Sequence, residues 1–358
     1  MLKFAFLVIL IVVMALSQLS GLTKMQQPAV FELAYPSYFG KGFSIPKDNP
    51  MTRQGVELGR MLFYERALSF DNSMSCATCH QQAFAFTDGE KFSKGVTGKA
   101  QQRNTMALVN LLWVKDFFWD GRVRGLEQQV EVPLTSAHEM GQSWAKTVEK
   151  LTAMPLYRRQ FKAAFGDAGI DQHRIAKALA QFERTLISSD SKYDRYLRGA
   201  YQPTATELNG ITLFYGSGQP GARGGFCAHC HGGPKTYQEL YMNNGLDSVF
   251  KDSGRFAWTG KDYDRGRFRV VSLRNIALTA PYMHDGRFAS LEEVVDHYSD
   301  QVVQTAFLSP FLLDVGGKQI RLTTKEKKEI VSFLHMLTDS SFISNPQFGD
   351  PFTTKQKI

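Results

Sequence analysis

The chain has 358 residues and a mass of 40.3 kDa, with 43% apolar and 21% charged residues. This composition excludes a disordered chain, a collagen-like repeat and a multispanning membrane protein, and the length suggests two domains. The net charge of +8 and a pI near 9.2 favour an anionic partner. The charges are scattered without a long basic run, so we expect no nucleic-acid partner.

The chain begins with a charged residue followed by an apolar segment. Lys3 precedes the apolar run Phe4–Leu16, and no further charge occurs before Lys24. This pattern is typical of a secretory signal peptide, and the uncharged stretch is also about long enough for a retained anchor. We therefore expect residues 1–23 to be a signal peptide or an N-terminal anchor, with the body of the protein in the periplasm and no other contact with the membrane.

Helical patterning dominates the body. Apolar residues at helical spacing predict helices within 171–187, around 291–298 and within 323–337. Each helix is preceded by a capping residue or a capping-box pair, namely Asp171, Ser290 with Glu293, and Thr323 with Glu326. Long glycine-bearing loops lie between the helical segments, and the strand signal is a short one around 267–273. We therefore expect a mainly α fold with long loops and little β structure.

The four cysteines fall in two copies of one motif, C-x-x-C-H, at Cys76–His80 and Cys227–His231. In this motif both cysteines can form thioethers to haem while the histidine ligates the iron. Three other uses of the cysteines are a redox-active C-x-x-C, a zinc site and disulfides. A redox C-x-x-C normally lies in a βαβ unit, which is absent here, and a zinc site would need the two C-x-x-C pairs close together. We interpret the chain as a protein with two covalent haem c groups. They would be held by Cys76, Cys79, His80, Cys227, Cys230 and His231.

One C-x-x-C-H motif falls in each half of the chain, and the turn at Gly166 and Gly169 is the expected seam. We therefore predict two cytochrome c-like haem domains. The N-terminal haem domain would comprise residues 30–168 and the C-terminal haem domain residues 169–345. A polar tail, 346–358, would follow.

Further segments surround the two motifs in a particular order: Ser75–His80, Arg103–Thr105, Phe117–Arg122, Leu126–Pro133, the second C-x-x-C-H, and Leu273–Tyr298. In their order and spacing the chain resembles the dihaem cytochrome c peroxidase/MauG family. The resemblance implies an enzyme, a cytochrome c peroxidase-type oxidoreductase that reduces hydrogen peroxide to water at an open N-terminal haem. The second haem would store or relay electrons.

The resemblance also implies an axial ligand for the C-terminal haem, fourteen residues after the histidine of a P-Y-x-H-D-G segment. That histidine is His284, and the ligand position is Tyr298. Tyr298 also shares a helical face with Leu291 and Val295. The alternative is a core tyrosine, with Met283, Met242 or His297 as the ligand. A phenolate ligand favours high-valent iron, whereas a methionine ligand raises the reduction potential of the haem. With Tyr298 as ligand, we therefore expect the C-terminal haem to accept electrons poorly from an ordinary cytochrome c.

The distal side of the N-terminal haem is expected to be open, because the loop Gln81–Gln102 lacks the histidine that closes it in reductively activated relatives. The family's distal pocket corresponds to Gln129, Pro133 and Glu139. Glu139 would move a proton between the peroxide oxygens, and Gln129 would position the ligand. The structural alternative for Glu139 is a capping box with Ser136.

Two further features follow from the resemblance. Trp119 corresponds to the tryptophan that relays electrons between the haems, with a core aromatic as the alternative. Asn104, Thr279 and Pro281 correspond to an inter-haem calcium site, and such side-chain and carbonyl oxygens suit that ion.

The chain departs from MauG at Gly225, where MauG carries a surface tryptophan, so maturation of a tryptophan-derived quinone is not expected. Other aromatic candidates for a relay to the surface are Trp113, Trp144, Trp258 and Tyr237. We expect a small cytochrome c or a cupredoxin as electron donor. The alternatives are MauG-like oxidation of a protein substrate and a non-enzymatic dihaem electron carrier, which would have a six-coordinate N-terminal haem.

Overall fold

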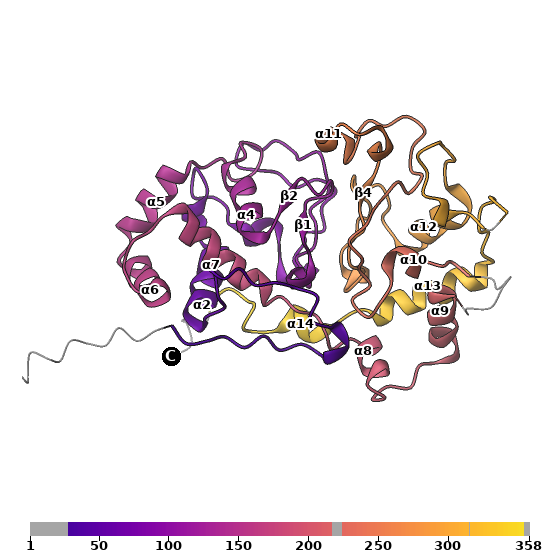
Figure 1. Ribbon diagram of the computed structural model, residues 1–358, viewed down its shortest axis with the longest axis horizontal. Helices are drawn as coiled ribbons and strands as arrows, with labels where there is room; N and C mark the ends of the chain where they lie inside the picture. Colours follow the sequence, from indigo (N-terminus) through magenta and orange to yellow (C-terminus); the bar gives the residue numbers. More distant parts are fainter. Residues whose placement is uncertain (1–27, 217–223, 315, 354–358) are drawn as a thin grey trace, which may run out of the picture.

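The computed structural model describes residues 28–216, 224–314 and 316–353, so the expected signal peptide or anchor, 1–23, lies outside the described residues. The chain forms two lobes that lie side by side (Figure 1). Within the described ranges no helix combines the length and the apolar character needed to cross a membrane.

The protein is mainly helical, as predicted. The α-helices are α2 (Arg53–Tyr64), α3 (Cys76–Cys79), α4 (Leu126–Thr135), α5 (Trp144–Ala153), α6 (Pro155–Phe165), α7 (Gln172–Arg184), α8 (Lys192–Leu197), α9 (Ala205–Tyr215), α10 (Ala228–His231), α11 (Phe256–Thr259), α12 (Leu291–Asp296), α13 (Thr324–Met336) and α14 (Ser340–Ser344). The short strands are β1 (Asp116–Phe117), β2 (Val123–Arg124), β3 (Tyr241–Met242) and β4 (Phe268–Arg269).

Short helices of other types complete the fold. The 3-10 helices are η1 (Ser37–Phe39), η2 (Arg66–Leu68), η3 (Gln82–Phe84), η4 (Leu111–Trp113), η5 (Asp262–Asp264), η6 (Ile276–Leu278) and η8 (Pro310–Leu312), and η7 (His297–Gln301) is a π-helix. Strand β1 pairs antiparallel with β2, and β3 pairs antiparallel with β4. Strand β4 lies inside the segment 267–273, where the sequence predicted a strand.

The core of the first lobe is built on the packing of α2 against α7. The two helices approach closely at Gly59, where a Cβ atom would clash with the carbonyl oxygen of Ala178. The apolar face of α7 includes Leu179 and Phe182, both buried in this core. This differs from the predicted seam at 168/169, which assigned α7 to the second domain. The first core instead continues through Leu186, because the apolar face of α7 is covered by α2 and α4.

The second lobe is centred on α9 and α13. Gly210 allows these helices to approach, since a Cβ there would clash with the carbonyl oxygen of Glu329. Next to this contact the rings of Phe214 and Phe333 pack edge to face with centroids 4.8 Å apart. Helix α12 packs on α13 and completes the core.

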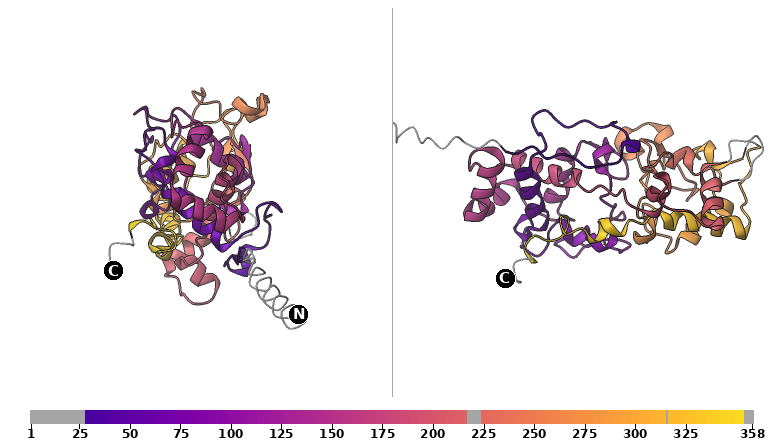
Figure 2. Two further views of the ribbon diagram at one scale, coloured as in Figure 1. Left: turned by 90° about the vertical axis from the view of Figure 1, so that its left-hand side faces the viewer. Right: turned by 90° about the horizontal axis from the view of Figure 1, so that it is seen from below.

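The C-terminal segment returns to the first lobe (Figure 2). After α13, the rings of Phe342 and Phe348 pack against each other and against Phe86. The Tyr64 hydroxyl donates to the carbonyl oxygen of Phe348, at 2.7 Å. The prediction of a polar tail over 346–358 is therefore wrong for its first residues, because Phe348 is buried in the first core.

The predicted helix caps are confirmed. The Asp171 carboxylate accepts from the Arg174 backbone N–H at 2.9 Å, and the pairs at 290/293 and 323/326 form capping boxes. The helix expected through position 298 differs, because α12 ends at Asp296 and the π-helix η7 follows. The capping-box alternative at Ser136 is wrong, since Ser136 ends α4 and starts no helix.

Candidate active site

Each C-x-x-C-H motif lines a cavity of its own. The first cavity, of about 1200 Å³, is lined by Cys76, Cys79 and His80 of the first lobe and extends to residues of the second lobe such as Asp252 and His284. The second cavity, of about 250 Å³, is lined by Cys227, Cys230 and His231 and by many apolar side chains. Concave, largely apolar sites with few polar groups are typical of cofactor pockets.

Both motif histidines are oriented by a backbone carbonyl. His80 Nδ1 lies 2.8 Å from the Phe86 oxygen, and His231 Nδ1 lies 3.0 Å from the Val271 oxygen. A carbonyl oxygen only accepts, so each Nδ1 carries the proton and Nε2 retains the lone pair that ligates a metal. Burial lowers the pKa of both rings, that of His231 to about 4, which keeps the imidazoles neutral.

The cysteines fit haem attachment better than the alternatives. All four are free thiols, so neither pair forms a disulfide. Across the described ranges no three or more His, Cys, Asp or Glu side chains gather around a metal-sized site, which argues against zinc. Two thiols beside a neutral imidazole on the wall of one large cavity are the donor set that a covalent haem requires.

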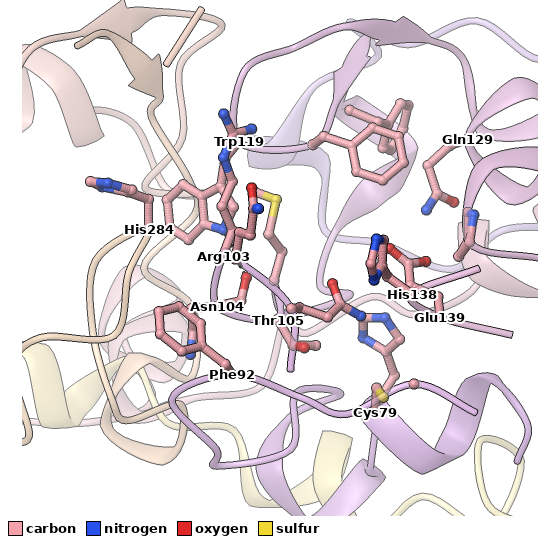
Figure 3. A pocket seen from close by; sticks show the side chains of 18 of the residues that line it. Cys79, Phe92, Arg103, Asn104, Thr105, Trp119, Gln129, His138, Glu139 and His284 are labelled. Carbon is pink, nitrogen blue, oxygen red and sulfur yellow. Dashed lines mark hydrogen bonds between the residues drawn. The ribbon is translucent and has the colours of Figure 1, made fainter. Parts of the chain in front are cut away.

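The predicted distal residues line the first cavity. Gln129 and Pro133 come from α4, and Glu139 comes from the turn that follows it. In Figure 3, Gln129, His138 and Glu139 lie together on one side of the cavity, opposite Trp119 and His284. Burial raises the pKa of Glu139, and the nearby positive charge of Arg122 opposes the rise only in part. A buried carboxyl with a raised pKa holds a proton more readily than an exposed glutamate does, which suits a group that takes up and releases a proton.

His138 also lines this cavity. The residue is exposed and lies beside Glu139 (Figure 3). Its place next to Glu139 in the sequence was the one signal that His138 could lie at the cavity.

Trp119 lines both cavities and so lies in the wall between them. Its indole N–H donates to the Asn104 oxygen at 2.8 Å, and its own carbonyl oxygen accepts from the Arg269 N–H at 2.7 Å. The first bond holds the indole ring to the first lobe, and the second ties the Trp119 backbone to the second lobe. The lobes are also joined by Arg103, which pairs with Asp120 at 2.6 Å and with Asp252 at 2.7 Å.

The second cavity brings together three of the four predicted ligand candidates, Tyr298, Met242 and Met283. The Asn244 amide N–H group donates to the Tyr298 hydroxyl at 3.5 Å and to the Met283 sulfur at 3.4 Å. Burial raises the pKa of Tyr298 to about 12. The fourth candidate, His297, does not line the cavity, and its Nε2 lies 2.9 Å from the Asn244 oxygen.

The expected calcium residues, Asn104, Thr279 and Pro281, all line the second cavity. The Asn104 amide donates to the Glu90 oxygen at 2.9 Å, which leaves its side-chain oxygen as the donor for a cation. No carboxylate cluster accompanies them in the described part of the chain. A calcium ion held here would therefore depend on neutral oxygens and water.

Glu183 is a cavity residue that the sequence reasoning missed. It lies on α7, lines the first cavity and is 5% exposed. Its Oε2 is buried and has no hydrogen-bond partner among the described residues. Burial raises the pKa of Glu183 to about 8, with Arg184 lowering it and Glu127 raising it less strongly. Its helical position among apolar neighbours gave no signal of this environment.

The raised pKa of Glu183 predicts a pH-dependent stability. Between the ordinary value of 4.5 and about 8, the folded protein holds a proton that the unfolded chain releases, so stability falls as pH rises through this range. In the wild type the free energy of unfolding should fall by on the order of 1.4 kcal/mol per pH unit in this range, and Glu183→Gln should abolish this fall. Urea unfolding at pH 5 and pH 8 measures the difference. Glu149→Gln, at an exposed site, is the control, and an unchanged pH dependence in Glu183→Gln would contradict the prediction.

Comparison with known proteins places the chain in a family. A sequence profile described as "Di-haem cytochrome c peroxidase" matches residues 53–202. The methylamine utilization protein MauG of Methylophilus methylotrophus is 32% identical over 295 residues, which cover 82% of this chain and 84% of the relative. Cytochrome c551 peroxidase of Pseudomonas aeruginosa is 32% identical over 302 residues, covering 82% of this chain and 81% of the relative.

A solved structure is also similar to this chain. The crystal structure of a MauG-like protein associated with microbial copper homeostasis superposes with a TM-score of 0.81 and 36% identity, covering 90% of this chain and 100% of that chain. The chain therefore belongs to the di-haem cytochrome c peroxidase family and is an oxidoreductase of that family acting on hydrogen peroxide.

Proposed function

We propose that this protein reduces hydrogen peroxide to water at the first cavity. The observation that carries the proposal is that one cavity holds both a haem-attachment motif with its oriented His80 and a buried carboxyl, Glu139, whose pKa is raised. Two haem c groups, attached at the two motifs, supply the iron and the redox equivalents when bound.

The side chains around the first cavity have separate tasks in this proposal. Glu139 takes a proton from one peroxide oxygen and returns it to the other, which makes the leaving oxygen water. The Gln129 amide holds the peroxide by hydrogen bonding. Pro133 has no backbone N–H and supplies an apolar wall that limits competing hydrogen bonds.

In the same proposal, the second cavity stores or relays the electrons. Tyr298 would hold the iron of the second haem, supported by its place on the cavity wall and by the engagement of His297 with the Asn244 carbonyl oxygen. Trp119 relays electrons between the two cavities, supported by its place in the wall between them. A calcium ion at Asn104, Thr279 and Pro281 belongs to the proposal as a structural element between the haems.

The proposal also includes the cellular setting. We place the protein in the periplasm, exported or anchored by residues 1–23. A small cytochrome c or a cupredoxin returns the electrons, and the net charge of +8 favours a donor with an acidic face.

Optical and EPR spectra of the fully ferric protein, before and after one equivalent of hydrogen peroxide, test the proposal. We expect one high-spin and one low-spin haem, with rapid loss of both ferric signals after peroxide. Tyr298→Phe should perturb the low-spin signal and leave the high-spin signal unchanged. Two low-spin haems that ignore peroxide would contradict the proposal. His138→Gln would then show whether His138 closes the distal position, because the high-spin signal would appear in that variant.

A second candidate function is MauG-like oxidation of a protein substrate. It is supported by Tyr298 in the second cavity and by relatives that carry the MauG name. The surface tryptophan of MauG has no counterpart here, since its position is Gly225. A Cβ at Gly225 would lie 3.1 Å from Ile330 Cδ1 and 3.2 Å from Cys227 Sγ. A tryptophan there would need the surrounding side chains to move, so a protein substrate would have to be oxidised through another residue.

A further inference from the structure

Four aromatic residues are candidates for a relay to the surface, and their surroundings separate them. The Trp113 indole is buried and donates to the Gly40 carbonyl oxygen at 3.0 Å, an acceptor that cannot take up a proton. Trp144 starts α5 and packs against the apolar core of the first lobe. Trp258 is 62% exposed on the short helix α11. Tyr237 differs from these three because its hydroxyl is bonded to a carboxylate.

The partner of Tyr237 is able to accept its proton. The Tyr237 hydroxyl donates to Glu239 Oε2 at 2.6 Å, and the same oxygen accepts from the Lys115 backbone N–H at 3.0 Å. The other carboxylate oxygen of Glu239, Oε1, is buried and has no hydrogen-bond partner among the described residues. A carboxylate oxygen is a hydrogen-bond acceptor, so Oε2 receives the phenolic O–H of Tyr237 directly, while Oε1 keeps its acceptor sites unused.

Tyr237 also lies beside the wall between the two cavities. The Arg269 guanidinium faces the Tyr237 phenol, and Arg269 lines both cavities. The backbone N–H of Arg269 holds the Trp119 carbonyl oxygen at 2.7 Å. Glu239 is bonded to Lys115, directly before β1 and the segment that leads to Trp119. The half-buried ring of Tyr237 thus connects the inter-cavity wall with the surface.

Other tyrosines that donate to carboxylates are less suited. Tyr241 is nearest in the chain, but its hydroxyl lies 3.2 Å from Asp116, whose carboxylate is also 3.9 Å from the Arg124 guanidinium. The bond from Tyr237 to Glu239 is shorter, at 2.6 Å, and gives the phenolic proton a more direct path to its acceptor. Tyr157 donates to Glu65 at 2.7 Å inside the first core, where its side chain is fully buried and does not reach the surface.

We propose that Tyr237 is a redox-active tyrosine that gives one electron to the peroxide-oxidised protein while its phenolic proton moves to Glu239. The inference rests on the peroxidase function proposed above. Peroxide takes up two electrons and two protons to become two water molecules. Tyr237 supplies one of these electrons and becomes a neutral tyrosyl radical. The external donor supplies the other electron, and a further donor electron reduces the radical, which recovers its proton from Glu239.

Freeze-quench EPR of the full-length holoprotein after one equivalent of hydrogen peroxide tests this assignment. We expect an organic radical whose hyperfine splitting narrows when the protein contains ring-deuterated tyrosine, a result that needs no variant. Tyr237→Phe should lower the radical yield at least tenfold, while peroxide still removes the ferric signals. Glu239→Gln keeps the ring and the bond from Lys115 but removes the proton acceptor, so it should also lower the yield severalfold.

Tyr241→Phe is the matched control, because it removes a tyrosine four residues farther along the same segment, one that also donates to a carboxylate, and should leave the radical yield unchanged. A radical that persists in Tyr237→Phe, or a wild-type protein that reacts with peroxide without a tyrosyl radical, would overturn the assignment and leave the peroxidase function standing. A protein whose ferric signals ignore peroxide would overturn both.

Discussion

Replacing Glu139 with glutamine should slow the reaction of the ferric protein with hydrogen peroxide by about 10²- to 10⁴-fold, the usual contribution of a positioned acid or base. The substitution keeps the size and the hydrogen-bonding reach of the side chain but removes its ability to move a proton. In the wild type the rate should rise with pH as Glu139 loses its proton. Because burial raises the pKa of this carboxyl, the rise should occur above the range of an ordinary glutamate. Stopped-flow absorbance across pH measures both effects.

The control for this experiment is Glu131→Gln, on the neighbouring helix α4 but not on the cavity wall. It should retain the wild-type rate and pH profile, and both variants should keep the ferric spectrum of the wild type. A Glu139→Gln protein that reacts within threefold of the wild type would show that the proton is moved by another group. His138, the other titratable side chain on that side of the cavity, would then be the residue to replace (Figure 3).

The second large effect is expected on stability, at the ion pair of Arg274 with Asp194. Both side chains are fully buried, and Arg274 also donates to the Pro234 carbonyl oxygen at 2.9 Å. Asp194 lies on α8, and Pro234 follows the second C-x-x-C-H motif, so the guanidinium connects that helix to a wall of the second cavity. Arg274→Met leaves the Asp194 charge buried and uncompensated. We expect a loss of about 3–5 kcal/mol in the free energy of unfolding, measured by urea denaturation.

Two further variants test the cause of that loss. Arg274→Met combined with Asp194→Asn removes both charges and should recover much of the stability, because a neutral pair has no charge to desolvate. Arg195→Met removes one partner of the exposed pair with Asp190 and should cost less than about 1 kcal/mol. A loss in Arg274→Met as small as that in Arg195→Met would contradict the prediction and indicate that water reaches Asp194.

The sequence predicted what depends on neighbouring residues. Helix starts at Asp171, Ser290 and Thr323 were correct because a capping side chain bonds a backbone N–H only two or three residues onward. The C-x-x-C-H motifs are equally local, since their donors lie within five residues. The distal residues Gln129 and Glu139 came from family resemblance, because no local pattern relates them to His80.

Features that depend on contacts between distant segments were decided only by the tertiary structure. Helix α7 joined the first core because α2 covers its apolar face, and Phe348 returned to the same core from a segment whose composition indicated a tail. The environments of Glu183 and Tyr237 likewise follow from how segments far apart in the chain fold around them. By itself the sequence determined the local elements, the two attachment motifs and the family. The burial of a residue, its proton affinity and its position between two cavities depend on contacts between segments that are far apart in the sequence. Only the tertiary structure could therefore decide them.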